Sequence, residues 1–336
     1  MVRDQGVSVL FLLKASAPLR SALRLKRNQG LDIIHLHWTS PFLVSSRRSL
    51  SMIKGGVFLL AIRLFKCINI RLVWTIHNLV SHEQQDSWLE VYFNRWLCQW
   101  VDRIIVHCPL AVDMVIESFS LPPGLREKFS VIPHGHFIAD YPNQIGFDTA
   151  RERLGLGPTE HTFLYFGQIR PYKNVFSLIE AFKRIDNQQV KLIIAGLPWD
   201  TVIEKQISVI TKDDPRIRTH LSWIPDEDMQ LYLNAADVVV LPFVDILSSS
   251  TVILAMSFGK PVITPSLGCS CDLLAGQSEL LYTYNQPDGL FLTMNKSLKM
   301  DLPRIGAQNY MKIQADTWET VGQATARVYQ EVMGVV

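Results

Sequence analysis

The chain has 336 residues, of which 48% are hydrophobic and 19% charged. This length and composition exclude a disordered protein and predict a globular protein of two domains, because a single hydrophobic core rarely grows so large. The net charge is only +2, and the basic residues are not interleaved with aromatic residues in one patch. Nucleic acid is therefore not expected as a partner.

The charge is distributed unevenly along the chain. Residues 1–140 carry 16 Lys and Arg against 10 Asp and Glu, a net charge of +6, and the remainder carries 17 against 21, a net charge of −4. Six early cations flank the apolar run at residues 57–62: Arg47, Arg48, Lys54, Arg63, Lys66 and Arg71. This run is too short to span a membrane. Two interpretations stay open, a basic amphipathic helix on an anionic membrane surface and an ordinary surface helix with its apolar face inward.

Apolar runs and helical patterns alternate along the chain. Strands are predicted in the first half at residues 7–12, 32–36, 72–76, 103–106 and 130–132. Strands are predicted in the second half at residues 163–166, 191–195, 238–241 and 262–264. Helices are predicted between them, for example at 88–101, 113–119, 226–236 and 250–258, and at 318–333. Strands rich in Val, Ile and Leu without polar alternation are typical of parallel sheets covered on both faces by helices.

The expected fold class is therefore α/β, with two Rossmann-like, doubly wound parallel-sheet domains that face a cleft. The first domain is expected at residues 1–142, a Pro- and Gly-bearing linker at 143–160, the second domain at 161–316, and a closing helix at 317–336. A Rossmann-like half normally starts with a strand, a glycine-bearing loop and a helix, and this set is missing here. The chain is therefore expected to be shortened at its N-terminus.

A phosphate site is predicted in the run Phe163-Leu-Tyr-Phe-Gly-Gln-Ile-Arg-Pro-Tyr-Lys-Asn174. An apolar strand stops at Gly167, the cations Arg170 and Lys173 follow in one short loop, and an amphipathic helical pattern comes next. The glycine lets the backbone approach a ligand, the helix start offers unpaired N–H groups, and the cations supply charge. The alternative is a solvated turn with two surface cations.

Five segments, taken together, resemble the family 4 retaining glycosyltransferases of the GT-B fold, in a bacterial polysaccharide-type subgroup. They are Asp32-Ile-Ile-His-Leu-His-Trp38, Val73-Trp-Thr-Ile-His-Asn78, Val131-Ile-Pro-His-Gly-His136, Phe166-Gly-Gln-Ile-Arg-Pro-Tyr-Lys-Asn174 and Gly259-Lys-Pro-Val262. The resemblance implies that the C-terminal helix crosses back to the first domain. It also implies a nucleotide-diphosphate sugar bound to the second domain as co-substrate, and a saccharide or lipid-linked acceptor against the first. It implies transfer of a hexose with retention of configuration and without a metal or further cofactor. No secretory signal is evident, and the expected location is cytoplasmic, peripheral at the inner face of the membrane.

The resemblance also assigns roles to particular residues. Lys173 matches the family's diphosphate-binding lysine, Gln168 stands where the family has an arginine, and Arg170 is the nearest cation. His77 matches a histidine near the reacting centre, so the predicted catalytic residues are His77, Arg170 and Lys173. The predicted donor-binding residues are Gly167, Gln168, Asn174, Asp245, Ser248, Ser249, Ser250 and Thr251. The predicted acceptor-side residues are His35, His37, Trp38, His134 and His136, with Gly135 expected to serve a turn of positive φ. No metal-ligating residues are predicted.

The chain departs from the family pattern at one pair of positions. The family usually places two glutamates eight residues apart where this chain has Ile246 and Leu254. Asp245 is expected to replace one acid in part. The run Ser248-Ser249-Ser250-Thr251 is expected to open a helix with a serine as its cap, and the N–H groups at that helix start to hold a phosphate or a sugar hydroxyl. A weak or inactive module that serves as a scaffold is the alternative function. A nicotinamide-dependent oxidoreductase is a further alternative, which the sequence disfavours because no G-x-G-x-x-G follows a predicted strand.

Overall fold

The computed structural model describes residues 22, 24–27, 30–45, 47–81 and 87–335. The strand expected at residues 7–12 lies outside them. The chain forms two compact units, Met1–Gly135 with Trp318–Val336 (unit 1) and His136–Thr317 (unit 2). Within the described ranges, no helix is both long and apolar enough to cross a membrane.

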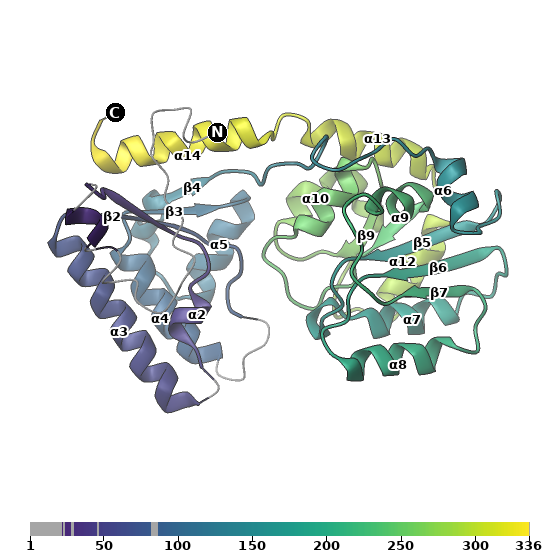
Figure 1. Ribbon diagram of the computed structural model, residues 1–336, viewed down its shortest axis with the longest axis horizontal. Helices are drawn as coiled ribbons and strands as arrows, with labels where there is room; N and C mark the ends of the chain where they lie inside the picture. The colour runs from purple at the N-terminus through teal and green to yellow at the C-terminus, as the bar shows by residue number, and fades with distance from the viewer. Residues whose placement is uncertain (1–21, 23, 28–29, 46, 82–86, 336) are drawn as a thin grey trace. The chain divides into compact units, whose positions relative to one another are not determined.

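Unit 1 is built on a four-stranded parallel sheet of order β1-β2-β3-β4. Its elements are β1 (Ile33–Leu36), α2 (Ser40–Leu43), α3 (Arg48–Cys67), β2 (Arg71–Thr75), α4 (Ser87–Trp100), β3 (Arg103–Val106), α5 (Pro109–Ser118), the 3-10 turn η2 (Pro123–Lys128), β4 (Phe129–Val131) and α14 (Trp318–Met333). The C-terminal helix α14 lies along one face of this sheet, and α3 and α4 lie toward the other (Figure 1).

The packing of α14 follows from the alternation of side chains along the strands. Val73 of β2 and Ile105 of β3 point to one face of the sheet and form a core cluster with Ile132 and with Val328 of α14. This packing confirms the prediction that the C-terminal helix crosses back to the first domain.

Unit 2 holds a six-stranded parallel sheet of order β10-β9-β8-β5-β6-β7. Its elements are α6 (Phe147–Arg153), β5 (His161–Phe166), η3 (Pro171–Lys173), α7 (Val175–Lys183), β6 (Val190–Ala195), α8 (Thr201–Thr211), β7 (Ile217–His220), α9 (Met229–Ala235), β8 (Val238–Val240), α10 (Ser250–Ser257), β9 (Val262–Pro265), α11 (Ser270–Leu273), η4 (Ala275–Leu280), β10 (Leu281–Tyr282), α12 (Gly289–Ser297) and α13 (Leu302–Ile313).

The sheet of unit 2 is buried on both faces, as the apolar runs predict. Phe163 and Tyr165 of β5 pack with α7, α8 and α12 in one core cluster, whereas Leu164 and Phe166 pack with α6, α9 and α10 in the other. The strand order is that of a doubly wound sheet, and its direction of winding reverses between β5 and β8. Ligands of such sheets bind beyond the carboxyl ends of the strands at this reversal.

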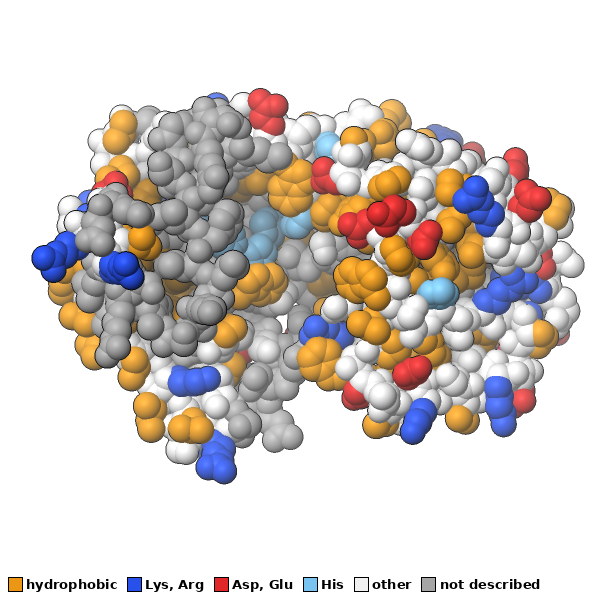
Figure 2. Space-filling model, in the orientation of Figure 1, with side chains coloured by type: hydrophobic (Ala, Val, Ile, Leu, Met, Phe, Trp, Pro, Cys, Tyr) orange, Lys and Arg blue, Asp and Glu red, His pale blue; other side chains and the backbone are white. Residues whose placement is uncertain are grey.

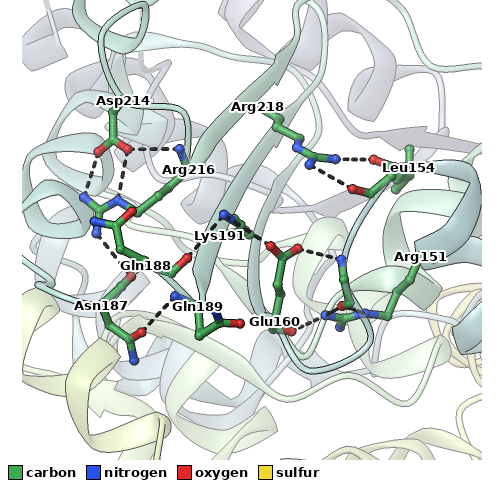
Figure 3. A network of polar contacts seen from close by, with 12 residues as sticks. Arg151, Leu154, Glu160, Asn187, Gln188, Gln189, Lys191, Asp214, Arg216 and Arg218 are labelled. Atoms are coloured by element: carbon green, nitrogen blue, oxygen red, sulfur yellow. Dashed lines mark hydrogen bonds and ion pairs between the residues drawn. The ribbon is translucent and has the colours of Figure 1, made fainter.

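Residues 143–160, expected to be a linker, are instead part of unit 2. Ala150 of α6 is fully buried in the core, and the buried guanidinium of Arg151 pairs with Asp237 at 3.2 Å. Arg151 also donates to the carbonyl oxygens of Gly157 and Glu160. Figure 3 shows this network of polar contacts near the starts of β5, β6 and β7. These polar contacts thus stabilise the edge of the sheet where the strands begin. The opposite edge, where the strands end, is formed by loops such as those after β5 and β8.

Two strands of unit 2 have no counterpart in the sequence prediction. β7 (Ile217–His220) is an edge strand whose last two residues are exposed, so it lacks an apolar run. β10 (Leu281–Tyr282) has two residues only. The other described strands lie within two residues of the predicted ranges. Most of them are buried and apolar, whereas β1 and β4 are only partly buried.

Candidate functional site

The loop after β5 brings three groups of unit 2 together. Gly167 has a φ of +110°, a conformation that side chains disfavour. A Cβ built there would lie 3.5 Å from Lys173 Nζ and 3.7 Å from Thr251 Oγ1. Gly196, which follows β6, packs closely against the same glycine: a Cβ on Gly196 would lie 1.9 Å from the carbonyl oxygen of Gly167. An ammonium, a hydroxyl and a bare backbone therefore converge where the sheet reverses its winding.

Lys173 is the most unusual charged residue at this place. It is only 9% exposed, and no carboxylate among the described residues pairs with it. Burial, and secondarily the charge of Arg170, lower the pKa of Lys173 to about 8. An ammonium removed from water without a counterion destabilises the protein unless a ligand neutralises it. The site is therefore prepared for an anion.

Gln168 and Trp199 are among the residues that orient Arg170 beside Lys173. Arg170 Nε donates to Gln168 Oε1 at 3.1 Å, and its guanidinium stacks over the exposed Trp199 ring at 4.2 Å. Gln168, which stands where the family has an arginine, thus orients the cation two positions later. Trp199 was not predicted from the sequence. It follows β6, which pairs with β5, and its place in the loop after a predicted buried strand was the signal that could have found it.

Two helix starts lie among the residues of unit 2 that were predicted to bind the donor. Asn174 adopts a left-handed conformation (φ 53°) directly before α7, and its Oδ1 accepts from Ser177 Oγ at 2.8 Å. Ser249 caps α10, accepting from the backbone N–H of Val252 at 3.3 Å. This confirms the predicted cap and leaves the first N–H groups of α10, near the Thr251 hydroxyl, without partners inside the helix.

Asp245 and Ser248 precede α10 in the same loop; Asp245 and Ser250 are exposed. Ile246 and Leu254, at the positions of the family's two acids, are 5% and 8% exposed and belong to the core. Both positions thus hold buried apolar side chains in place of the carboxylates that are usual in the family.

In unit 1, histidines occur at the ends of all four described strands. His35 and His37 lie at the end of β1, His77 follows β2, His107 follows β3, and His134 follows β4. Parallel strands bring their carboxyl ends to the same edge of a sheet, so these rings gather there. Figure 2 shows histidine side chains grouped on the visible face.

Three of these rings form a chain of hydrogen bonds. His37 Nδ1 lies 3.0 Å from His77 Nε2, and His77 Nδ1 lies 3.3 Å from His107 Nε2. His107 Nδ1 lies 3.0 Å from the carbonyl oxygen of Ile132. Burial lowers the pKa of His77 to about 3 and that of His107 to about 4, so both rings are neutral at pH 7. Neighbouring histidines add to the effect.

Sequence reasoning missed His107. It follows a buried apolar strand in the same way as His77, and this shared position was the available signal. In a parallel sheet, equivalent positions on adjacent strands are neighbours.

Trp38 and a small cavity lie beside the histidine chain. The Trp38 ring, 61% exposed, stacks on His77 at 4.6 Å with 21° between the planes. Both rings and His37 line a cavity of about 20 Å³ together with the buried Trp74 and Glu90. The indole Nε1 of Trp74 has no hydrogen-bond acceptor within the described part of the chain. An exposed aromatic plane beside polar rings is suited to a sugar.

His35, predicted on the acceptor side, is engaged by the protein itself. Its Nδ1 lies 2.6 Å from the Tyr329 hydroxyl and its Nε2 lies 2.8 Å from Thr75 Oγ1. Burial lowers the pKa of His35 to about 3. His35 therefore ties β1 to β2 and α14, and neither ring nitrogen is open to a ligand in this arrangement.

The segment from His134 to His136 is divided between the two units. The His134 ring packs edge-on against His107 and Trp318, and its Nδ1 donates to the carbonyl of Gly135 at 2.7 Å. Gly135 has no positive φ, so that expectation is wrong; a Cβ there would lie 2.5 Å from the Trp318 ring, and close packing explains the glycine. His136 lies in unit 2, and its Nδ1 accepts from the backbone N–H of Ile138 at 3.2 Å.

No group of three or more His, Cys, Asp or Glu side chains in the described ranges has an arrangement that could hold a metal ion.

Comparison with known proteins identifies both halves of the chain. The family model described as "Glycosyltransferase Family 4" matches residues 6–136, and the one described as "Glycosyl transferases group 1" matches residues 160–299. A GDP-mannose:glycolipid 4-beta-D-mannosyltransferase from Xanthomonas campestris pv. campestris is 25% identical over 307 residues, which cover 90% of this chain and 80% of that protein.

Solved structures share the fold. Sucrose-phosphate synthase from Thermosynechococcus elongatus superposes with a TM-score of 0.74 at 18% identity, covering 99% of this chain and 83% of the other. HepE from Anabaena, solved in complex with UDP, superposes with a TM-score of 0.72 at 17% identity, covering 93% and 82%. With a glycosyltransferase model matched in each half and the GT-B architecture shared, the chain belongs to the family 4 glycosyltransferases.

Proposed function

We propose that this glycosyltransferase moves a hexose from a nucleotide-diphosphate sugar to a saccharide or lipid-linked acceptor, and that Lys173 and Arg170 hold the diphosphate. One observation carries the proposal. Lys173 is a buried ammonium without a counterion in the described chain, and both this ammonium and the Thr251 hydroxyl lie within 4 Å of where a side chain on Gly167 would start. A diphosphate supplies the missing negative charge.

The proposed chemistry follows from where charge develops. As the bond between the sugar and the diphosphate breaks, negative charge accumulates on the departing phosphate oxygens. Preoriented positive groups in a water-poor site stabilise that charge more than they stabilise the substrate. Lys173, Arg170 and the N–H groups at the start of α10 are such groups, so we propose that transfer needs no metal ion.

Retention of anomeric configuration is the part of the proposal that rests on the family resemblance. The name of the Xanthomonas relative records a β linkage for that protein. The anomeric configuration of the product, read from the NMR coupling of its anomeric proton, tests retention directly. A product of the configuration opposite to that of the donor would overturn this part alone.

Binding of a nucleoside diphosphate is expected to stabilise the protein. A ligand that binds only the folded state adds about 2.7 kcal/mol at a concentration 100 times its dissociation constant. We expect UDP or GDP to raise the melting temperature in a concentration-dependent way, while the matching nucleoside has little effect because it lacks the diphosphate. If neither diphosphate shifts the transition, the donor site is not where we place it.

A catalytically weak module that acts as a scaffold is the second candidate function. The burial of Ile246 and Leu254 at the positions of the family's two acids favours it. A thermal shift with nucleoside diphosphates, combined with no product from any nucleotide sugar tested with saccharide and glycolipid acceptors, would support it. Product formation would refute it.

We also propose that unit 1 rests on an anionic membrane surface through α3. This helix buries one apolar face, with Phe58 and Ile62, yet it exposes a second apolar stripe. The stripe consists of Ile53, Val57, Leu60 and Leu64, which are 63%, 63%, 61% and 41% exposed. Hydrophobic side chains mix with Lys and Arg over α3 in Figure 2.

Aromatic and basic side chains beside the stripe favour a lipid headgroup region. Arg48 stacks on the half-exposed Trp88 at 4.7 Å, and Arg63 stacks on Trp100 at 5.0 Å. Indole rings and cations beside an apolar stripe are typical of interfacial helices, and each cation near an anionic surface contributes about 1 kcal/mol. The peripheral location and the glycolipid-type acceptor belong to this same proposal.

The double substitution Val57→Asp with Leu60→Asp is expected to weaken co-sedimentation with anionic vesicles by at least about tenfold, because it places charge in the apolar stripe. Val209→Asp, at a residue 62% exposed on α8 of unit 2, is the matched control and should bind like the wild type. Equal binding of all three proteins would contradict the membrane proposal without touching the donor site.

A further inference from the structure

We propose that His37 binds a hydroxyl group of the saccharide acceptor through Nε2, and that His77 and His107 are positioning residues which fix the tautomer of His37. The inference rests on the proposed function, since it concerns the acceptor of the same transfer. It names a specific atom as the acceptor's hydrogen-bond partner and two residues that act only through it.

The anchor of the chain is a backbone carbonyl. The oxygen of Ile132 can only accept a hydrogen bond, and it lies 3.0 Å from His107 Nδ1. The proton of neutral His107 is therefore on Nδ1. Its other nitrogen, Nε2, carries a lone pair and can only accept.

This direction passes along the chain. His107 Nε2 accepts, so His77 Nδ1, at 3.3 Å, is the donor and carries the proton of that ring. His77 Nε2 then carries the lone pair and accepts from His37 Nδ1 at 3.0 Å. Three successive rings are thus held in the same tautomer by one carbonyl.

The series of hydrogen-bonded histidines ends at a ring nitrogen that can still accept a hydrogen bond. With its proton on Nδ1, His37 has a lone pair on Nε2, and that atom has no hydrogen-bond partner within the described chain. The His37 side chain is exposed and lines the cavity beside Trp38 and His77. A carbonyl or carboxylate would meet a lone pair there, whereas a sugar hydroxyl can donate to it.

Neutral rings are required for this order, because a protonated histidine donates from both nitrogens. Burial lowers the pKa of all three rings, to about 3 for His77 and about 4 for His107. The ordered chain therefore persists at pH 7.

The tautomers can be measured in the ligand-free protein. Histidine side chains labelled with ¹⁵N in the full-length protein give two-bond nitrogen–proton correlations that distinguish the Nδ1–H form from the Nε2–H form. Signals are assigned by their loss in single His→Gln variants. We expect His37, His77 and His107 all in the Nδ1–H form. A His37 ring in the Nε2–H form would overturn the inference.

A variant tests the positioning role. His107→Phe removes the acceptor of the His77 proton, and we expect both His77 and His37 to lose their pure Nδ1–H form. His220→Phe, at an exposed histidine of unit 2, is the matched control and should leave both rings unchanged. If His37 keeps its tautomer in a folded His107→Phe protein, His107 does not position it.

Steady-state kinetics distinguish an effect on acceptor binding from an effect on donor binding. His107→Phe should raise the KM for the acceptor about fivefold, the cost of one weakened neutral hydrogen bond, with the KM for the donor unchanged. His37→Gln, whose amide oxygen can accept a hydrogen bond, should retain more acceptor affinity than His37→Phe. An unchanged acceptor KM in His37→Phe would overturn the inference. If no transfer occurs at all, the proposed function fails while the tautomers are still decided by NMR.

Discussion

Replacing Lys173 with Met is expected to lower kcat/KM for sugar transfer by about 10²–10³-fold, the range measured when one preoriented oxyanion donor is removed. The side chain of Met has a similar length and no charge, so the buried pocket stays filled. The leaving diphosphate then loses its closest cation. Steady-state kinetics with a nucleotide-sugar donor measure the effect.

The same substitution is expected to raise the melting temperature of the ligand-free protein. Lys173 is buried without a counterion in the described chain, so its charge costs stability that a ligand restores. Nucleoside diphosphate should therefore stabilise the wild type more than the variant. Lys205→Met, at an exposed residue of α8, is the matched control and should change neither quantity. A variant that is both less stable and equally active would contradict the assignment.

Donor affinity should also depend on pH through Lys173. The pKa of the free residue is lowered to about 8, and a bound diphosphate raises it again because it favours the charged form. Below pH 8 Lys173 is already protonated in the free protein, so its titration does not change donor affinity. Above pH 8 Lys173 must take up a proton when the diphosphate binds, so donor affinity falls as the pH rises. Titration of UDP or GDP between pH 6.5 and 9.5 measures this fall, which Lys173→Met should abolish.

Replacing His77 with Phe is expected to lower turnover by about tenfold or more while changing donor affinity about twofold at most. Phe keeps a ring against Trp38, at 4.6 Å in the wild type, but removes both nitrogen atoms. The hydrogen bonds to His37 and His107 are then lost, and the acceptor side of unit 1 is no longer ordered.

The comparison of kcat with donor Kd decides the role of His77. His220→Phe serves as the control for a histidine-to-phenylalanine change elsewhere, and circular dichroism checks the fold. A loss confined to donor affinity, with turnover preserved, would reassign His77 to recognition of the donor in its ground state.

The buried parts of the fold were predictable from the sequence because burial leaves a pattern. The apolar strand that ends at Phe166 and the amphipathic helix after Asn174 were both visible, and so was the helical pattern of α14, whereas its crossing to the first domain followed from the family resemblance. Edge strand β7 was not, because its exposed residues carry no apolar run. Residues 143–160 were mistaken for a linker, because Pro and Gly mark turns within a domain as well as between domains.

The candidate site was predictable in its residue types and less so in its contacts. Gly167 and Lys173 follow from the strand–loop–helix pattern, but the stacking of Arg170 on Trp199 depends on the pairing of β5 with β6. His107 depends likewise on its strand lying beside that of His77. His35 has the spacing of an acceptor-side residue, yet its partner Tyr329 lies 294 positions away in the chain. Such long-range neighbours leave no local signal.

Crystallisation of the protein with UDP or GDP tests the central claim most directly. The account predicts phosphate oxygens about 3 Å from Lys173 Nζ, between the backbone of Gly167 and the hydroxyl of Thr251. A nucleoside diphosphate bound elsewhere on unit 2, with Lys173 untouched and still without an anion, would contradict it.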